Sequence, residues 1–271
     1  MLALSGHTGL TMRSSFMEIL VLLCAFVAFA LALEVGFRLG ARRQARSDDT
    51  EKSHVSALHG ATLGLLALLL GFTFAMSVSR YETRKTLMVD QANAIGTAAL
   101  RARMLPAPDG DRAYALLRDY TASRLQYNAA GMDDAAIVAA EARASALETQ
   151  LWAIARAQIT ADPKSQPASL FTQALNDVFD LREKRRFALD DQVPTAVTFL
   201  LAAVALTSMG LVAYGCGLNG RRRISPNLTF AFLIALALII ILDIDSPRAG
   251  FVRVSQDSLV RLQQSFSPAT P

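Results

Sequence analysis

Four long apolar stretches constrain this chain more than any other feature. They are Phe16–Leu39, Ala57–Ser79, Val193–Leu218 and Pro226–Leu242. A hydrocarbon core about 30 Å thick needs ~20 apolar residues in a helix, and a helix satisfies its own backbone hydrogen bonds inside that core. The sequence therefore predicts an integral membrane protein with four transmembrane helices in two pairs.

The region between the two pairs, residues 80–192, is polar and has the spacing of helices. Two of its segments carry apolar residues at alternating intervals of three and four, which places one stripe on each helix. The stripes are Ile137, Ala140, Ala144, Leu147, Leu151 and Ile154, and then Phe171, Ala174, Val178 and Leu181. The alternation typical of strands appears nowhere in the sequence. We therefore predict an all-α integral membrane protein with a helical insert between transmembrane helices two and three.

This pattern divides the chain into four parts. Residues 1–79 form an N-terminal transmembrane hairpin, and residues 80–192 form a soluble helical insert continuous with the membrane helices. Residues 193–247 form a C-terminal transmembrane hairpin, and residues 248–271 form a tail. Because Arg80–Leu105 contains no proline, it is expected to continue the second span as one long helix.

Composition and motifs narrow the function classes. The chain has 271 residues, of which 52% are hydrophobic, and a formal net charge of +4. In a membrane protein such a surplus usually reflects basic loops that set orientation, so we expect membrane lipid, and no nucleic acid, as a partner. No GxSxG, HExxH, Walker or Rossmann pattern is present, and Cys24 and Cys216 both lie inside apolar spans. The sequence predicts no enzymatic activity, no cofactor and no metal site.

Ionisable residues within or beside the spans are candidates for function, because an unpaired charge in lipid is energetically costly. These candidates are Glu34, Arg80, Asp243 and Asp245. One interpretation is that they line an ion path, or that the two aspartates hold a cation. The alternative is structural: Glu34 pairs with Arg38 one helical turn later, and the aspartates pair with arginines or with backbone amides at the start of a span.

Glycines inside the spans predict close helix packing, because small residues let helix backbones approach each other in lipid. They are Gly60, Gly64 and Gly71 in the second span, and Gly210, Gly215 and Gly217 in the third.

A basic run precedes the third span and consists of Arg182, Lys184, Arg185 and Arg186. We interpret it as a solvated collar at the level of the lipid headgroups, with an anion-concentrating vestibule as the alternative.

Three stretches resemble a known family. They are Gly64–Phe74 leading to Arg80, then Gln91–Thr97 continuing to Leu105-Pro106, and finally Asp243–Ser255, which includes Ala249, with Leu259 after it. Together they are similar to the bacterial bestrophin-like membrane proteins, a broad group of undefined function. The second span also resembles the second transmembrane helix of the bestrophin anion channels, since Leu70-Gly71-Phe72 is followed by Arg80-Tyr81. The two pairs of spans around a helical insert are similar to bestrophin architecture.

The resemblance implies a ring of identical subunits, a pentamer in bestrophins, in which the second span lines a central pore. Bestrophins place a hydrophobic neck on one face of that helix, and the matching candidates for pore-lining residues are Gly64, Leu68 and Phe72. Gly64 departs from the bulky residue of the family pattern and would widen the neck. The alternative for this face is plain helix packing. The acidic clasp that binds calcium in animal bestrophins has no convincing counterpart.

Orientation is open, because two arguments disagree. The hairpin connections hold Arg42, Arg43, Arg46, Lys52 and Arg221 to Arg223, and the positive-inside rule would place them in the cytoplasm. Bestrophin topology implies the reverse, with the insert in the cytoplasm. The density of charge favours cytoplasmic hairpins, whereas long segments obey the rule poorly.

Two functional hypotheses follow. The first is an oligomeric channel for chloride or another small anion in the bacterial inner membrane, with the second span lining the pore. The second is a non-conducting membrane scaffold or sensor whose helical insert binds a partner through its apolar stripes.

Overall fold

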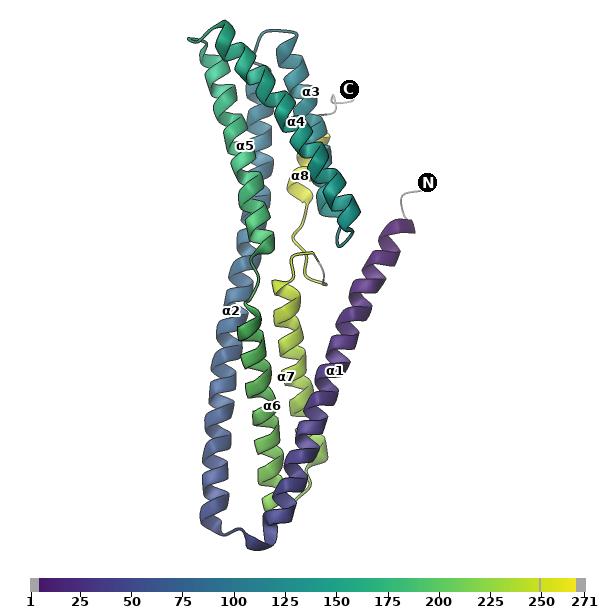
Figure 1. Cartoon of the computed structure of the whole chain (residues 1–271), viewed down its shortest axis with the longest axis vertical. Coiled ribbons are helices and arrows are strands. Elements are labelled where there is room, and N and C mark those ends of the chain that lie inside the picture. The colour runs from purple at the N-terminus through teal and green to yellow at the C-terminus, as the bar shows by residue number, and fades with distance from the viewer. Residues whose placement is uncertain (1–4, 249, 267–271) are drawn as a thin grey trace. The chain divides into compact units, whose positions relative to one another are not determined.

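The structure, a computed structural model, describes residues 5–248 and 250–266. Its helices are α1 (Ser5–Arg43), the short η1 (Gln44–Arg46), α2 (Asp49–Ala102), α3 (Asp109–Ala129), α4 (Asp134–Ala161), α5 (Gln166–Asp190), α6 (Thr195–Leu218), α7 (Ile224–Asp245) and α8 (Asp257–Ser265) (Figure 1). All regular structure in these residues is helical, which confirms the predicted all-α class. Ala249 and residues 267–271 of the predicted tail lie outside the described residues, as do residues 1–4.

Within the described residues, four segments are long and apolar enough to cross a membrane, and they include α1, the first part of α2, α6 and α7. The predicted membrane protein with four transmembrane helices is confirmed in this respect. Helix α2 is continuous for 54 residues, so the expectation that residues 80–105 continue the second span is confirmed as far as Ala102.

The chain forms two compact units, each described here by itself. The membrane unit contains α1, the first part of α2, α6 and α7. The helical unit contains the rest of α2 together with α3, α4, α5 and α8.

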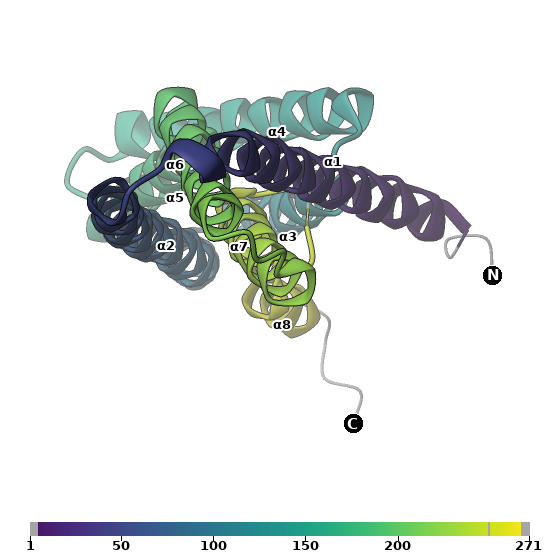
Figure 2. The ribbon, with the colours of Figure 1, turned by 90° about the horizontal axis from the view of Figure 1, so that it is seen from below.

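In the membrane unit, α1 packs closely against α6 and also against α7 (Figure 2). Glycines permit the approach of α1 to α6. A Cβ at Gly217 of α6 would lie 2.7 Å from the backbone nitrogen of Ala41, and one at Gly40 would lie 3.0 Å from the backbone nitrogen of Leu218. The apolar core of the unit includes Phe29, which is buried. The expectation of close packing is therefore confirmed for Gly217.

The glycines of α2 behave differently. A Cβ at Gly60, Gly64 or Gly71 would meet no atom within 4 Å among the described residues. The expectation that these glycines mark a packing face is therefore wrong within this chain. They lie on a part of α2 that the rest of the membrane unit leaves uncovered.

The helical unit buries the two apolar stripes predicted from the sequence. Leu147 and Leu151 of α4 and Phe171 and Val178 of α5 lie in one core, which α2, α3 and α8 complete. Asp133 caps the N-terminus of α4 by accepting a hydrogen bond from the backbone N–H of Ala136 at 3.1 Å, which satisfies one of the free amides of the first turn.

Helix α8 was not anticipated from the sequence. Its Leu259 is fully buried in the core of the helical unit, and α8 packs against α3. Much of the predicted tail is therefore a structural part of this unit.

A partly buried network of charged side chains joins α3, α4 and α5. Glu141 of α4 accepts from Arg124 of α3 at 3.0 Å and from Arg182 of α5 at 2.5 Å. Glu148 lies about two helical turns after Glu141 on the same side of α4. It accepts from Arg182 and from the hydroxyl of Tyr120 at 2.9 Å. Burial opposes ionisation of Glu141, yet Arg124 and Arg182 hold its pKa below the ordinary value. Burial raises the pKa of Glu148, despite its pairing with Arg182.

The basic run of α5 is only partly solvated. Arg182 points into the network just described, and Arg185 is buried and donates to Gln91 and to Asn128. Burial and the nearby Arg124 charge lower the pKa of Arg185 to about 10. The interpretation of the run as a solvated collar is therefore wrong for Arg182 and Arg185, whereas Lys184 and Arg186 are exposed. Arg182 lies opposite the carboxylates of Glu141 and Glu148, whereas Arg185 donates to the amide oxygens of Gln91 and Asn128, so both arginines serve the packing of the helical unit.

Candidate functional site

The candidate pore-lining residues lie on one exposed face of α2. Gly64, Leu68 and Phe72 recur at intervals of four, so they follow one another along the same side of the helix. The side chains of Leu68 and Phe72 are 55% and 62% exposed. The buried residues of this part of α2, Leu66, Thr73 and Ser77, lie on the opposite side and face the other membrane helices.

The exposed face of α2 is apolar from Ala57 to Met76. Leu65, Phe74 and Met76 are also exposed. In a membrane helix such a face meets lipid, another subunit or an ion path, since none of these positions is needed for packing inside the chain. The face is therefore available for contacts outside the subunit.

Glu34 of α1 is held by two arginines. Its carboxylate accepts from Nε of Arg38 at 2.6 Å and from Arg222, in the connection between α6 and α7, at 2.6 Å. The pair with Arg38 is the one expected from the structural alternative. Arg222 adds a tie between α1 and the α6–α7 connection that sequence spacing could not indicate.

Asp243 and Asp245, at the end of α7, both bind backbone amides. Asp243 accepts from the N–H groups of Phe251 and Val252 at 2.7 and 3.0 Å, and Asp245 accepts from the N–H of Val193 at 2.8 Å. Both aspartates are buried. Val193 opens the third predicted span, so the contact of Asp245 matches the alternative of an amide at a span start. The aspartates fix the segments before α6 and after α7.

Arg80 and Arg84 bind the end of α5 inside the helical unit. Arg80 donates to the carboxylate of Asp191 at 3.1 Å. Arg84, which is buried, donates to the carbonyl oxygens of Ala188 and Asp191 at 3.0 Å each. Cations at the carbonyl end of a helix complement its dipole. Sequence analysis identified Arg80 as a candidate but not Arg84. The interval of four residues between them was the signal that both lie on the same face of α2.

The charged candidates do not form one site. Glu34 contacts the connection that follows α6, whereas Asp245 contacts Val193, which precedes α6. These two places lie at opposite ends of a 24-residue helix, which spans about 36 Å at 1.5 Å per residue. Among the described residues no group of three or more histidine, cysteine, aspartate or glutamate side chains is placed to hold a metal ion.

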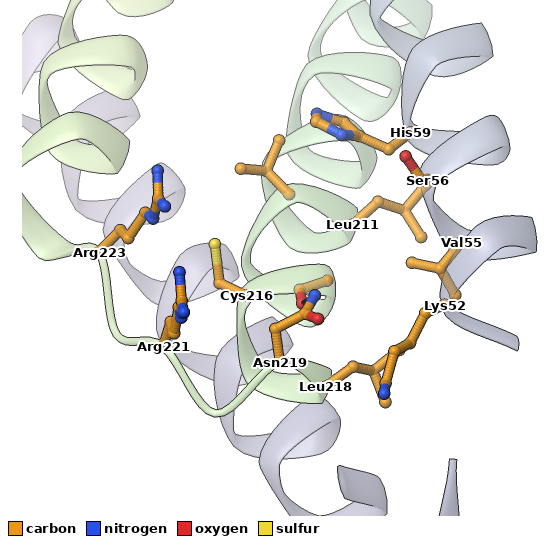
Figure 3. Close-up of a pocket in the computed structure, with 12 residues that line it drawn as sticks. Lys52, Val55, Ser56, His59, Leu211, Cys216, Leu218, Asn219, Arg221 and Arg223 are labelled. Atoms are coloured by element: carbon orange, nitrogen blue, oxygen red, sulfur yellow. Dashed lines mark hydrogen bonds between the residues drawn. The ribbon is translucent and has the colours of Figure 1, made fainter. Parts of the chain in front are cut away.

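A cleft that sequence analysis did not identify lies at the hairpin end of the membrane unit (Figure 3). It has a volume of about 520 Å³. Its polar lining consists of Lys52, Ser56 and His59 on α2, Cys216 on α6, and Asn219, Arg221 and Arg223 on the connection to α7. The only sequence signal was the basic character of the two hairpin connections, which was interpreted in terms of orientation.

Comparison with known proteins assigns the fold and the family. The solved structure of a bacterial Bestrophin homolog from Klebsiella pneumoniae is similar with a TM-score of 0.62 and 14% sequence identity, over 92% of this chain and 96% of that chain. A variant of that homolog is similar with a TM-score of 0.61 and 15% identity, over 87% of this chain and 96% of that chain. No curated protein matches the sequence.

The sequence itself matches the family described as Bestrophin-like domain over residues 24–259. This range takes in α1 from Cys24 onward, the other three membrane helices, the whole insert and the start of α8. The chain belongs to the Bestrophin-like family.

Proposed function

We propose that this chain is one subunit of a homo-oligomeric anion channel in the bacterial plasma membrane, with α2 lining the pore. The proposal rests on the family, on the fold shared with a bacterial Bestrophin homolog, and on one observation. The stripe of Gly64, Leu68 and Phe72 faces away from the buried side of α2 and is exposed.

The exposed stripe has the chemistry of a hydrophobic neck. Leu68 and Phe72 present only hydrocarbon, and a ring of such side chains around an axis closes a narrow pore to ions by excluding water. Gly64 adds no side chain, and the space beside it is open within the subunit. The neck is therefore formed by two residues per subunit and is wider at Gly64.

Assembly of identical subunits is supported by the area of apolar surface on α2. Cyclic symmetry brings the same face of each subunit to one axis, so a single stripe per chain is enough to line a pore. Small residues such as Gly60 and Gly71, which pack against nothing inside the chain, allow neighbouring helices to approach closely in lipid.

The alternative of a non-conducting scaffold loses the observation that motivated it. The apolar stripes of α4 and α5 are buried in the core of the helical unit, with Leu151 and Phe171 fully buried. These stripes therefore do not offer a free face to a partner protein.

The test is chloride flux through purified protein in liposomes. We expect flux from the unaltered protein, faster flux from Phe72→Ala because the neck widens, and slower flux from Gly64→Leu because a third apolar ring narrows the pore. The matched control is Phe74→Ala, which removes an exposed aromatic ring from a different side of α2 and should leave flux unchanged.

Absence of chloride flux from a correctly assembled oligomer would refute the proposal. Equal changes in flux for Phe72→Ala and Phe74→Ala would still support a channel, but they would contradict the proposal that Gly64, Leu68 and Phe72 line its pore.

A further inference from the structure

The cleft at the hairpin end of the membrane unit has a positively charged lining. Lys52, Arg221 and Arg223 line it, and its lining contains no carboxylate (Figure 3). Its volume of about 520 Å³ falls within the range of roughly 300–1,000 Å³ typical of small-molecule sites. We propose that this cleft binds a phosphate-bearing anion of the class carried by the headgroup of an acidic phospholipid.

Within the part of the chain that the structure describes, the two arginines of the cleft make no polar side-chain contact that stabilises the fold. Among the described residues, neither Arg221 nor Arg223 takes part in a side-chain hydrogen bond or ion pair, whereas Arg222 between them pairs with Glu34. Lys52 contacts Asp49 at 3.1 Å, but the Asp49 side chain is fully exposed, so water screens that pair strongly. Cations whose side chains form no ion pair within the chain are free to bind an external anion.

A further polar atom in the lining has no partner in the described chain. Nε2 of His59 is buried from solvent and makes no hydrogen bond there. In Figure 3 the imidazole projects from α2 toward α6. A buried ring nitrogen without a partner costs free energy, and a phosphate oxygen in the cleft would supply the missing acceptor when that nitrogen carries the proton.

The remaining lining favours the headgroup of a lipid over a free ion. Val55, Leu211, Val212 and Leu218 form an apolar wall beside the cations. The cleft also lies where α2 and α6 meet their polar connections, which is the level at which headgroups meet a transmembrane helix. Arginines bind phosphate through two parallel hydrogen bonds, and basic pockets between membrane helices recognise anionic headgroups.

The cleft is distinct from the proposed pore. At 100° per residue, Lys52, Val55 and His59 lie on the side of α2 that also carries the buried Leu66, opposite the stripe of Leu68 and Phe72. A ligand in the cleft would therefore bind between α2 and α6 of one subunit, and the inference does not depend on ion conduction.

The test measures lipid binding to the full-length protein, stripped of lipid and returned to mixed micelles. We expect phosphatidylglycerol to bind more tightly than phosphatidylcholine, with the difference read from bound lipid by native mass spectrometry. The double variant Arg221→Gln with Arg223→Gln should weaken phosphatidylglycerol by about tenfold or more, since each basic residue near an anionic headgroup contributes roughly fivefold. The double variant should fold normally, because both arginines are exposed.

The matched control is Arg42→Gln with Arg46→Gln, which removes the same charge from the other hairpin connection at exposed positions outside the cleft. Its affinity for phosphatidylglycerol should change by less than about threefold, because screened charges at a distance act weakly. Charge-conserving changes, Arg221→Lys with Arg223→Lys, should keep most of the preference. Cys216 reports occupancy directly: in a Cys24→Ser background, phosphatidylglycerol should slow its reaction with a thiol reagent.

Inorganic phosphate distinguishes the two sources of the ligand. Displacement of phosphatidylglycerol by inorganic phosphate supports recognition of the phosphate itself and assigns the cleft to free and lipid-borne anions alike. Binding that resists inorganic phosphate supports a site that needs the lipid. Equal binding of the two lipids, or equal loss in the cleft variant and the control, overturns the proposal.

Discussion

The carbonyl oxygen of Gly210 in α6 occupies the space that a Cβ at Gly36 of α1 would require. The two helices therefore meet through backbone rather than side chains at this point. The obstacle is a main-chain carbonyl, so it cannot rotate away as the end of a flexible side chain would.

We expect Gly36→Ala to destabilise the membrane unit, because α1 must move away from α6 to admit the methyl group. Overpacking of this kind costs roughly 1–3 kcal/mol, which should appear as a lower melting temperature in detergent. Gly60→Ala is the control: a Cβ there meets no described atom within 4 Å, so the melting temperature should stay the same or rise slightly.

Gly250 should be equally intolerant, for two reasons. Its φ of +101° is a conformation that side chains rarely adopt, and a Cβ there would lie 2.8 Å from Cγ of Asp243. Gly250→Ala should therefore break the hydrogen bonds that the amides of Phe251 and Val252 donate to the carboxylate of Asp243. We expect a loss of about 2–4 kcal/mol in the free energy of unfolding, measured by thermal denaturation.

Gly131→Ala separates the effect of a positive φ from the effect of steric overlap with Asp243. Gly131 also has a positive φ, of +57°, but no described atom lies within 4 Å of its Cβ position. Its substitution should cost only the backbone strain of about 1–2 kcal/mol. Equal losses at Gly131 and Gly250 would mean that Asp243 contributes nothing to this turn.

The two partly buried carboxylates of α4, Glu141 and Glu148, should give opposite dependences on pH. The folded-state pKa of Glu141 is lowered, so its ionisation stabilises the fold above the ordinary pKa, and this contribution is lost as the pH falls through the lowered value. Glu141→Gln should therefore reduce stability at pH 7 by about 3 kcal/mol, because Arg124 is left buried without its carboxylate. The variant should also lose part of the acid sensitivity of the unaltered protein.

Glu148→Gln is the comparison on the same helix. The folded-state pKa of Glu148 is raised by burial, so its contribution is present below the ordinary pKa and is lost as the pH rises through the raised value. At pH 7 the glutamine should cost less than it does at Glu141, and its amide oxygen can still accept from Tyr120. Melting curves at several pH values measure both, and identical curves for the two variants would contradict the assignment.

We expect the orientation that the bestrophin resemblance implies, with the insert in the cytoplasm, rather than the one that the basic hairpin connections indicate. We expect Ser145→Cys, an exposed position on α4, to be protected from an impermeant thiol reagent in intact cells. Ser53→Cys, at the other end of α2, should be labelled. Both changes are made with Cys24 and Cys216 replaced by serine, and the reverse pattern would place the insert outside the cytoplasm.

Hydrophobic length and heptad spacing were enough to predict the four spans, the all-α class and the buried stripes of α4 and α5. Helix ends were less accessible: α1 begins at Ser5 and not near Phe16, because a helix can continue beyond its apolar segment. Helix α8, nine residues long, was missed because its sequence was read only as part of a tail, and the packing of Leu259 and Leu262 into the core of the helical unit reveals its role.

The sequence could not predict which helices and side chains contact one another in the folded chain. Glycine content indicates that a helix can be approached closely, but it does not say by which helix, so Gly217 and Gly64 looked alike although only Gly217 is packed within the chain. Arg185 continues the apolar stripe of α5, so its burial was foreseeable from spacing, yet its charge suggested solvent. The cleft at Arg221 and Arg223 depends on α2 and α6 lying together.

The contact between Gly36 and Gly210 also determines when during synthesis α1 can pack against α6. Most of the chain is translated between these two residues, and at roughly 5–20 residues per second α1 resides in the bilayer for on the order of ten seconds before α6 leaves the ribosome. During that interval Gly36 of α1 lacks the α6 backbone that it contacts in the folded unit. Helix α1 therefore meets this neighbour late, and the membrane unit is completed only after the whole insert has been synthesised.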